Sequence, residues 1–234
     1  PDSTHKIRNW NGQSCGPGDL VTLRQALAIS CNTAFAWLGN ELGDDALRAQ
    51  AELMGFDTSF EIPLRAATSR YPEDPDAPQT AMTAIGQFDV RATSLQMAMV
   101  ASAIANNGVL MNPYLVQEVR GPDLAILQTT APSEFETAMT PLYASQLTDM
   151  MVNVVENGTG SNARIPGVRV AGKTGTAQTG NDNPAVAWFV AFAPATSPQV
   201  AVAVTVEDAG APEVSGNQLA APIAKAVIQA ILRR

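Results

Sequence analysis

The chain has 234 residues, of which 46% are hydrophobic and 15% charged, so it can bury a substantial core and a disordered chain is excluded. Its formal net charge of −8 argues against nucleic acid or an anionic membrane surface as the main partner, because both would repel it. No apolar run reaches the roughly eighteen residues of a membrane-spanning helix.

The first half of the chain is predicted to be mainly helical. Apolar periodicity and capping signals place helices over residues 23–43, 44–54 and 94–106. The first of these opens with Thr22 and Gln25, three positions apart, in the pattern of a capping box. Residues 56–80 are rich in proline and acidic side chains and are predicted to form a long surface loop.

The second half adds strands. Short paired strands are expected on either side of the turn at 121–123, and a helix begins at Thr140-Pro141. Three more strands are predicted over residues 168–179, 185–193 and 199–206, and connections this short imply antiparallel neighbours. A last helix over 216–234 is expected to cover this sheet.

The strongest chemical signal lies in residues 168–179, VRVAGKTGTAQT, where a strand presents a lysine, two threonines and a glycine in succession. One cation followed by hydroxyl donors suits an anionic ligand, which an acidic protein must capture locally. Because short motifs also occur by chance, an edge strand with polar residues is the plain alternative. Upstream, Ser30 and Asn32 interrupt the first predicted helix, and they also fit a simple polar break in that helix.

The two cysteines, Cys15 and Cys31, lie 16 residues apart and show no metal-ligand spacing, so no metal site is expected. Two buried thiols and one disulfide both fit this pattern, and the disulfide would need an oxidising compartment. His5 is the only histidine and is expected on the surface, which leaves a serine-histidine-aspartate triad without a base.

Taken together, these motifs resemble the transpeptidase domain of class B penicillin-binding proteins. Lys-Thr-Gly-Thr and Ser-x-Asn match two of the three motifs of serine acyltransferases that bind penicillin. The likeness extends over nearly the whole chain, through AIGQ at 84–87, IANNGVLMNPYLV at 104–116, VVENGTGSNA at 154–163 and AWFVAFAP at 187–194. It implies an α+β fold, with an antiparallel β-sheet flanked by helices and an all-α subdomain, in a single domain over residues 1–234.

The chain departs from the family at the third motif, Ser-x-x-Lys, which carries the nucleophile. The formal match at Ser3 and Lys6 lies too close to Ser30, and the residues after it cannot form the expected apolar helix. We therefore expect that the nucleophilic serine, its lysine, the first strands and the central helix lie upstream of these 234 residues. The chain alone is then expected to be inactive.

The resemblance implies a D,D-transpeptidase that cross-links peptidoglycan stem peptides ending in D-Ala-D-Ala through a serine acyl-enzyme in septal wall synthesis. β-Lactams would inhibit it, and no cofactor is expected. Catalytic roles would fall on Ser30 in a proton relay, on Asn32 as a partner of the upstream lysine and the substrate amide, and on Lys173.

Substrate binding would fall on the residues that follow Lys173. The hydroxyls of Thr174 and Thr176 would bond the terminal carboxylate, and Gly175 would leave room for the substrate backbone. The backbone N–H of Thr176 would form half of an oxyanion hole. Residues 158–160, Gly-Thr-Gly, either form a plain helix exit or shape the site.

An enzyme of this family would act at the extracytoplasmic face of the bacterial membrane, anchored only through upstream residues, with division-machinery proteins as partners. In that compartment a Cys15–Cys31 disulfide is expected. Two alternatives stay open: a D,D-carboxypeptidase, in which water resolves the same acyl-enzyme, and a non-catalytic scaffold or β-lactam sensor.

Overall fold

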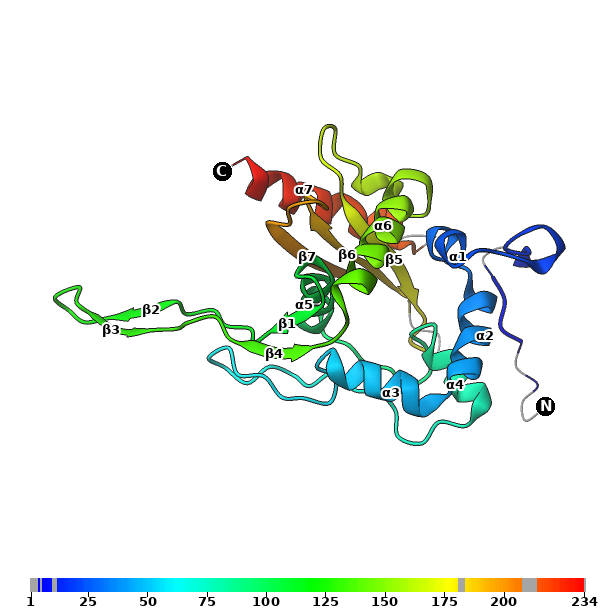
Figure 1. Cartoon of the computed structure of the whole chain (residues 1–234), viewed down its shortest axis with the longest axis horizontal. Helices are drawn as coiled ribbons and strands as arrows, with labels where there is room; N and C mark the ends of the chain where they lie inside the picture. Colours follow the sequence, from blue (N-terminus) through cyan, green and yellow to red (C-terminus); the bar gives the residue numbers. More distant parts are fainter. Residues whose placement is uncertain (1–3, 5, 10–11, 181–183, 208–213, 234) are drawn as a thin grey trace.

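The computed structural model describes residues 4, 6–9, 12–180, 184–207 and 214–233 (Figure 1). Ser3 and His5 lie outside the described residues. The α-helices are α1 (Leu23–Ile29), α2 (Asn32–Leu42), α3 (Asp44–Leu53), α4 (Ala77–Thr83), α5 (Ser94–Ala105), α6 (Pro141–Asn157) and α7 (Ala221–Leu232). The strands are β1 (Val109–Met111), β2 (Glu118–Arg120), β3 (Ile126–Thr129), β4 (Glu134–Thr137), β5 (Ala171–Ala177), β6 (Val186–Ala193) and β7 (Val200–Val206).

The centre of the fold is an antiparallel sheet in the order β5-β6-β7, which confirms the predicted meander. Helix α7 covers one face of this sheet, and α5 and α6 pack against the other (Figure 1). Helices α2, α3 and α4 pack together beside it. The fold is therefore α+β, as expected from the sequence.

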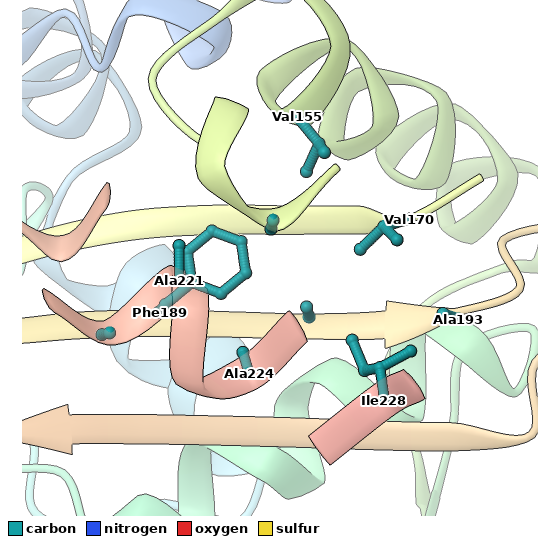
Figure 2. Packing of buried hydrophobic residues seen from close by; sticks show 10 residues of the cluster. Val155, Val170, Phe189, Ala193, Ala221, Ala224 and Ile228 are labelled. Carbon is teal, nitrogen blue, oxygen red and sulfur yellow. The ribbon is translucent and has the colours of Figure 1, made fainter. Parts of the chain in front are cut away.

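The core forms on both faces of β6, because successive residues of a strand point to opposite sides. On one face, fully buried Phe189 and Ala191 pack against Ala224 and Ile228 of α7 (Figure 2). On the other face, buried Phe192 packs against α5 and α6. Each buried phenylalanine stabilises the fold by roughly 2 kcal/mol, and β5 pairs with the strand that carries them, at the edge of the sheet.

The predicted helix over 23–43 is wrong in one respect, because it is two helices. Helix α1 ends at Ile29 and is capped by Ser30, whose φ of 57° is left-handed, and α2 begins after Cys31. The Ser30 and Cys31 N–H groups donate to carbonyls of Leu27 and Ala26 and close α1. The break therefore places Ser30 on a sharp turn and not on a helix face.

The predicted loop over 56–80 is also partly wrong, since α4 begins at its end. Asp76 and Gln79 form a reciprocal capping box there, with the side chain of each accepting from the backbone of the other. The remainder of the segment is irregular and carries isolated bridges.

The paired strands around the turn at 121–123 are confirmed as the β2–β3 hairpin, which extends away from the body of the molecule (Figure 1). Strand β1 instead pairs with β4, a strand that no pattern in the sequence predicts. No helix among the described residues is both long and apolar enough to cross a membrane.

Candidate active site

Two elements that are distant in sequence meet at Lys173 and Ser30. Strand β5 carries Lys173, and the turn between α1 and α2 carries Ser30. The Lys173 Nζ donates to Ser30 Oγ at 2.9 Å and to its neighbour's carbonyl, Thr174 O, at 2.7 Å. The structure thus brings together two of the predicted catalytic residues, 143 positions apart.

Burial lowers the pKa of Lys173 to about 8 from the ordinary value of 10.5. Both of its hydrogen-bond partners in the described part of the chain are uncharged, so no anion offsets the loss of solvent. At neutral pH the Lys173 amine is therefore still mostly protonated. Lys173 can therefore serve as a cation, and it can also release a proton near pH 8.

The outer edge of β5 presents backbone groups to the same region. Lys173 Nζ donates to Thr174 O, and Gln87 Nε2 donates to Thr176 O at 3.5 Å, so both carbonyls point away from β6. In an extended strand the N–H of a residue points to the same side as its C=O. No strand among the described residues pairs with this edge. The Thr174 and Thr176 N–H groups consequently face the open edge.

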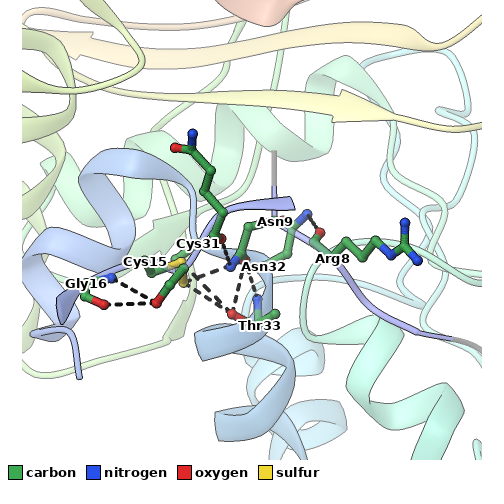
Figure 3. Close-up of a disulfide and its surroundings, with 9 residues drawn as sticks. Arg8, Asn9, Cys15, Gly16, Cys31, Asn32 and Thr33 are labelled. Carbon is green, nitrogen blue, oxygen red and sulfur yellow. Dashed lines mark hydrogen bonds between the residues drawn. A yellow bond between two sulfur atoms is a disulfide. The ribbon is translucent and has the colours of Figure 1, made fainter. Parts of the chain in front are cut away.

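Asn32, the third predicted catalytic residue, is not joined to the Lys173–Ser30 pair by a described hydrogen bond. It begins α2, and its Nδ2 donates to Arg8 O at 3.0 Å (Figure 3). The same segment is held at Asn9, whose Oδ1 accepts from the backbone N–H of Thr33. The residues before α1 therefore pack against the start of α2 and orient the Asn32 side chain.

A disulfide joins Cys15 to Cys31, with the two Cα atoms 6.0 Å apart (Figure 3). Cys31 is almost fully buried and lies between Ser30 and Asn32. The bond thus anchors the Ser30 turn to the loop that precedes α1.

The Gly-Thr-Gly segment after α6 lies against both elements of the site. The Thr159 N–H donates to Ala28 O at 3.0 Å, and the Thr159 and Thr174 hydroxyl oxygens lie 2.7 Å apart. A Cβ on Gly158 would meet Ala28 O at 2.2 Å, so this approach needs glycine. Of the two uses left open by the sequence, the segment therefore contacts the candidate site and is not a plain helix exit.

Two further residues support the site and were missed in the sequence. Gln87, within the AIGQ run, reaches the open edge of β5. Asn217 accepts from the Asn162 N–H at 2.9 Å and donates to Ser161 Oγ at 3.2 Å, which ties the start of the last helical segment to the loop after α6. No local pattern distinguishes this asparagine, because its partners are 55 and 56 residues away.

This arrangement can bind an anion and can pass a proton between Lys173 and Ser30. A cation, two threonine hydroxyls and backbone N–H groups on an edge that no described strand pairs with suit a carboxylate and a developing oxyanion. Within the described residues, no group of three or more His, Cys, Asp or Glu side chains is placed to hold a metal ion.

Comparison with protein families matches residues 1–229 to the penicillin-binding protein transpeptidase domain. Among curated proteins, the chain is 49% identical over 238 residues to the peptidoglycan D,D-transpeptidase PbpA of Mycolicibacterium smegmatis. It is 46% identical over 239 residues to that of Mycobacterium tuberculosis. Each match covers 100% of this chain and 48% of the relative, so the chain spans about half the length of these relatives.

Solved structures of M. tuberculosis penicillin-binding protein A are also similar to this chain. The ceftriaxone acyl-enzyme complex of M. tuberculosis penicillin-binding protein A superposes with a TM-score of 0.95 at 45% identity, covering 98% of this chain and 53% of that one. Its penicillin G acyl-enzyme complex gives a TM-score of 0.92 at 45% identity, covering 99% and 53%.

Proposed function

The chain belongs to the family of penicillin-binding protein transpeptidase domains, and from this premise we propose that it forms one wall of the acyl-transfer site of a peptidoglycan D,D-transpeptidase. The donor would be a stem peptide ending in D-Ala-D-Ala, and β-lactams would acylate the same site. The observation that carries the proposal is the bond from Lys173 to Ser30 beside the open edge of β5.

In this proposal the nucleophilic serine and its lysine come from a Ser-x-x-Lys segment upstream of the 234 residues, while residues 1–234 belong to one transpeptidase domain. Ser30 passes a proton toward the leaving amine, and Lys173 keeps that path polarised. Asn32 uses its amide oxygen to hold the upstream lysine and its remaining N–H for the substrate amide.

Substrate binding falls to the residues after Lys173. The ammonium and the hydroxyls of Thr174 and Thr176 hold the terminal carboxylate of the donor peptide. The Thr176 N–H, on the open edge of β5, polarises the scissile carbonyl as half of an oxyanion hole. Gly175 lets the peptide backbone approach the strand.

The proposal places the site on the extracytoplasmic face of the membrane, where peptidoglycan is built. The Cys15–Cys31 disulfide supports this location, because disulfides persist mainly in oxidising compartments. A role in septal synthesis with division-machinery partners is part of the same proposal, and it rests on the family resemblance of the sequence motifs.

The test uses a longer protein that joins these 234 residues to an upstream Ser-x-x-Lys segment. It should be labelled by a fluorescent penicillin, while residues 1–234 alone should stay unlabelled. With stem peptides and an amine acceptor, the longer protein should release D-Ala and form cross-linked dimers. Hydrolysed monomer alone would indicate a D,D-carboxypeptidase, and an unlabelled longer protein would indicate a non-catalytic scaffold or sensor.

A further inference from the structure

Thr159 is bonded to both halves of the candidate site. Its backbone N–H donates to Ala28 O, two residues before Ser30, and its hydroxyl oxygen lies 2.7 Å from that of Thr174, the residue after Lys173. The loop after α6 also packs tightly against α1 at Gly158, whose backbone lies close to Ala28 O. Thr159 therefore holds a fixed position relative to the Thr174 hydroxyl.

The hydrogen count of this threonine pair limits what it can do. Each hydroxyl has one hydrogen, so within the pair one threonine donates and the other accepts. A carboxylate offers only acceptors, and a hydrogen bond to an ionised acceptor is about twice as strong as one between neutral groups. A bound carboxylate will therefore take the Thr174 hydrogen, and Thr159 must then be the donor to Thr174.

We propose that Thr159 is a positioning residue: its hydroxyl donates to Thr174 Oγ1 and thereby aims the Thr174 hydrogen at the terminal carboxylate of the ligand. This inference rests on the proposed function, since it takes a C-terminal carboxylate as the group held beside Thr174. Bonds in such a chain polarise and strengthen one another. Thr159 thus selects for ligands with a free carboxylate without touching the reacting atoms.

The test compares Thr159→Val, which keeps the shape but loses the hydroxyl, with Thr159→Ser, which keeps the hydroxyl, in the longer protein. Both variants leave the backbone bond to Ala28 intact. The acylation rate constant is measured with a penicillin and with its methyl ester. Thr159→Val should lower the rate with the penicillin by about tenfold and leave the rate with the ester within about twofold. Thr159→Ser should restore the rate with the penicillin.

A double variant separates positioning from general damage. If Thr159 acts through Thr174, adding Thr159→Val to Thr174→Val should cause no further loss with the penicillin. The inference would be overturned if Thr159→Val lowered the acylation rate equally with the penicillin and the ester, or lowered it with neither. Thr159→Ala replaces Thr159→Val in the comparison if the latter does not fold.

Failure of the proposed acyl-transfer site is recognised separately, because the wild-type longer protein would then not be acylated at all. In that event, equilibrium binding of N-acetyl-D-Ala-D-Ala and its methyl ester decides the inference. The role of Thr159 is supported if Thr159→Val weakens binding of the acid and leaves binding of the methyl ester unchanged. Unchanged binding of the acid by this variant, or the absence of any binding by the wild type, refutes it.

Discussion

The Lys173 ammonium donates a 2.9 Å hydrogen bond to the Ser30 hydroxyl across 143 residues of sequence. Because Lys173 supplies the donor in this bond, the hydrogen of Ser30 is left to point at another acceptor. A serine held in this way can hand a proton to a leaving group and recover one from the lysine. This pair explains why the chain needs both a sharp turn after α1 and a lysine at the edge of the sheet.

Two substitutions of Ser30 should separate its chemistry from its backbone. Ser30→Ala and Ser30→Gly both remove the hydroxyl and should slow acylation of the longer protein by a penicillin, roughly a hundredfold each. Since φ at Ser30 is 57°, Ser30→Gly should be more stable to urea than Ser30→Ala by about 1 kcal/mol. If either variant were acylated as fast as the wild type, Ser30 would not be part of the proton path.

The partly buried Lys173, with its lowered pKa, should make stability depend on pH. The folded chain holds Lys173 with a pKa of about 8, against 10.5 for an ordinary lysine, so between these values the unfolded chain binds more protons. Stability relative to Lys173→Met should therefore rise with pH across this window, by about 3 kcal/mol in total. Urea unfolding from pH 7 to 10.5 measures it, with Lys225→Met on α7 as the control. A difference in stability between wild type and Lys173→Met that does not vary with pH would contradict the lowered pKa of Lys173.

The disulfide should stabilise the Ser30 turn. Reduction, or Cys15→Ser, should lower the free energy of unfolding by about 3 kcal/mol, the value for a closed loop of this size. Once Cys15 is replaced, a reductant should have no further effect on stability. Thiol titration of denatured, non-reduced protein should find no free thiol, and a count of two would refute the bond.

Gly158 should be sensitive to a single methyl group. Gly158→Ala places a Cβ at 2.2 Å from Ala28 O, so the loop must move away from α1, at a cost of about 2 kcal/mol or more. Gly121→Ala in the β2–β3 hairpin is a suitable control, because its nearest atom is the end of the Asp123 side chain. Equal stability of the two variants would show that the loop after α6 does not pack tightly against α1.

Local signals in the sequence account for much of the fold. Threonines at positions 22, 93 and 140 accept hydrogen bonds from the backbone at the starts of α1, α5 and α6, which explains why these helices are predictable. The antiparallel meander was also predictable, since short connections allow few other arrangements.

Features decided by distant contacts were harder to predict. The break at Ser30 interrupts a run that favours helix throughout, and it is held by a disulfide and by Lys173. Helix α4 was hidden because its capping residues, Asp76 and Gln79, lie in a proline-rich run that is typical of a loop. The pairing of β1 with β4 requires a hairpin to be inserted between them, and no local pattern reports it.

The prediction of the candidate site relied on the family resemblance more than on the residue pattern alone. A lysine with two threonines indicates only an anion-binding strand, and nothing in its spacing points to Ser30. The contact of Thr159 with Thr174 could not be predicted either, because it depends on how the loop after α6 packs on α1.

The most direct measurement of the central claim is the acylation rate of the longer protein by a fluorescent penicillin, compared between wild type and Lys173→Ala. If Lys173 polarises Ser30 and holds the carboxylate, the rate should fall by about a hundredfold or more at a temperature where both proteins are folded. Lys225→Ala in α7, at a residue with no role in the proposed site, should acylate as the wild type does. Equal acylation rates of wild type and Lys173→Ala would contradict the account.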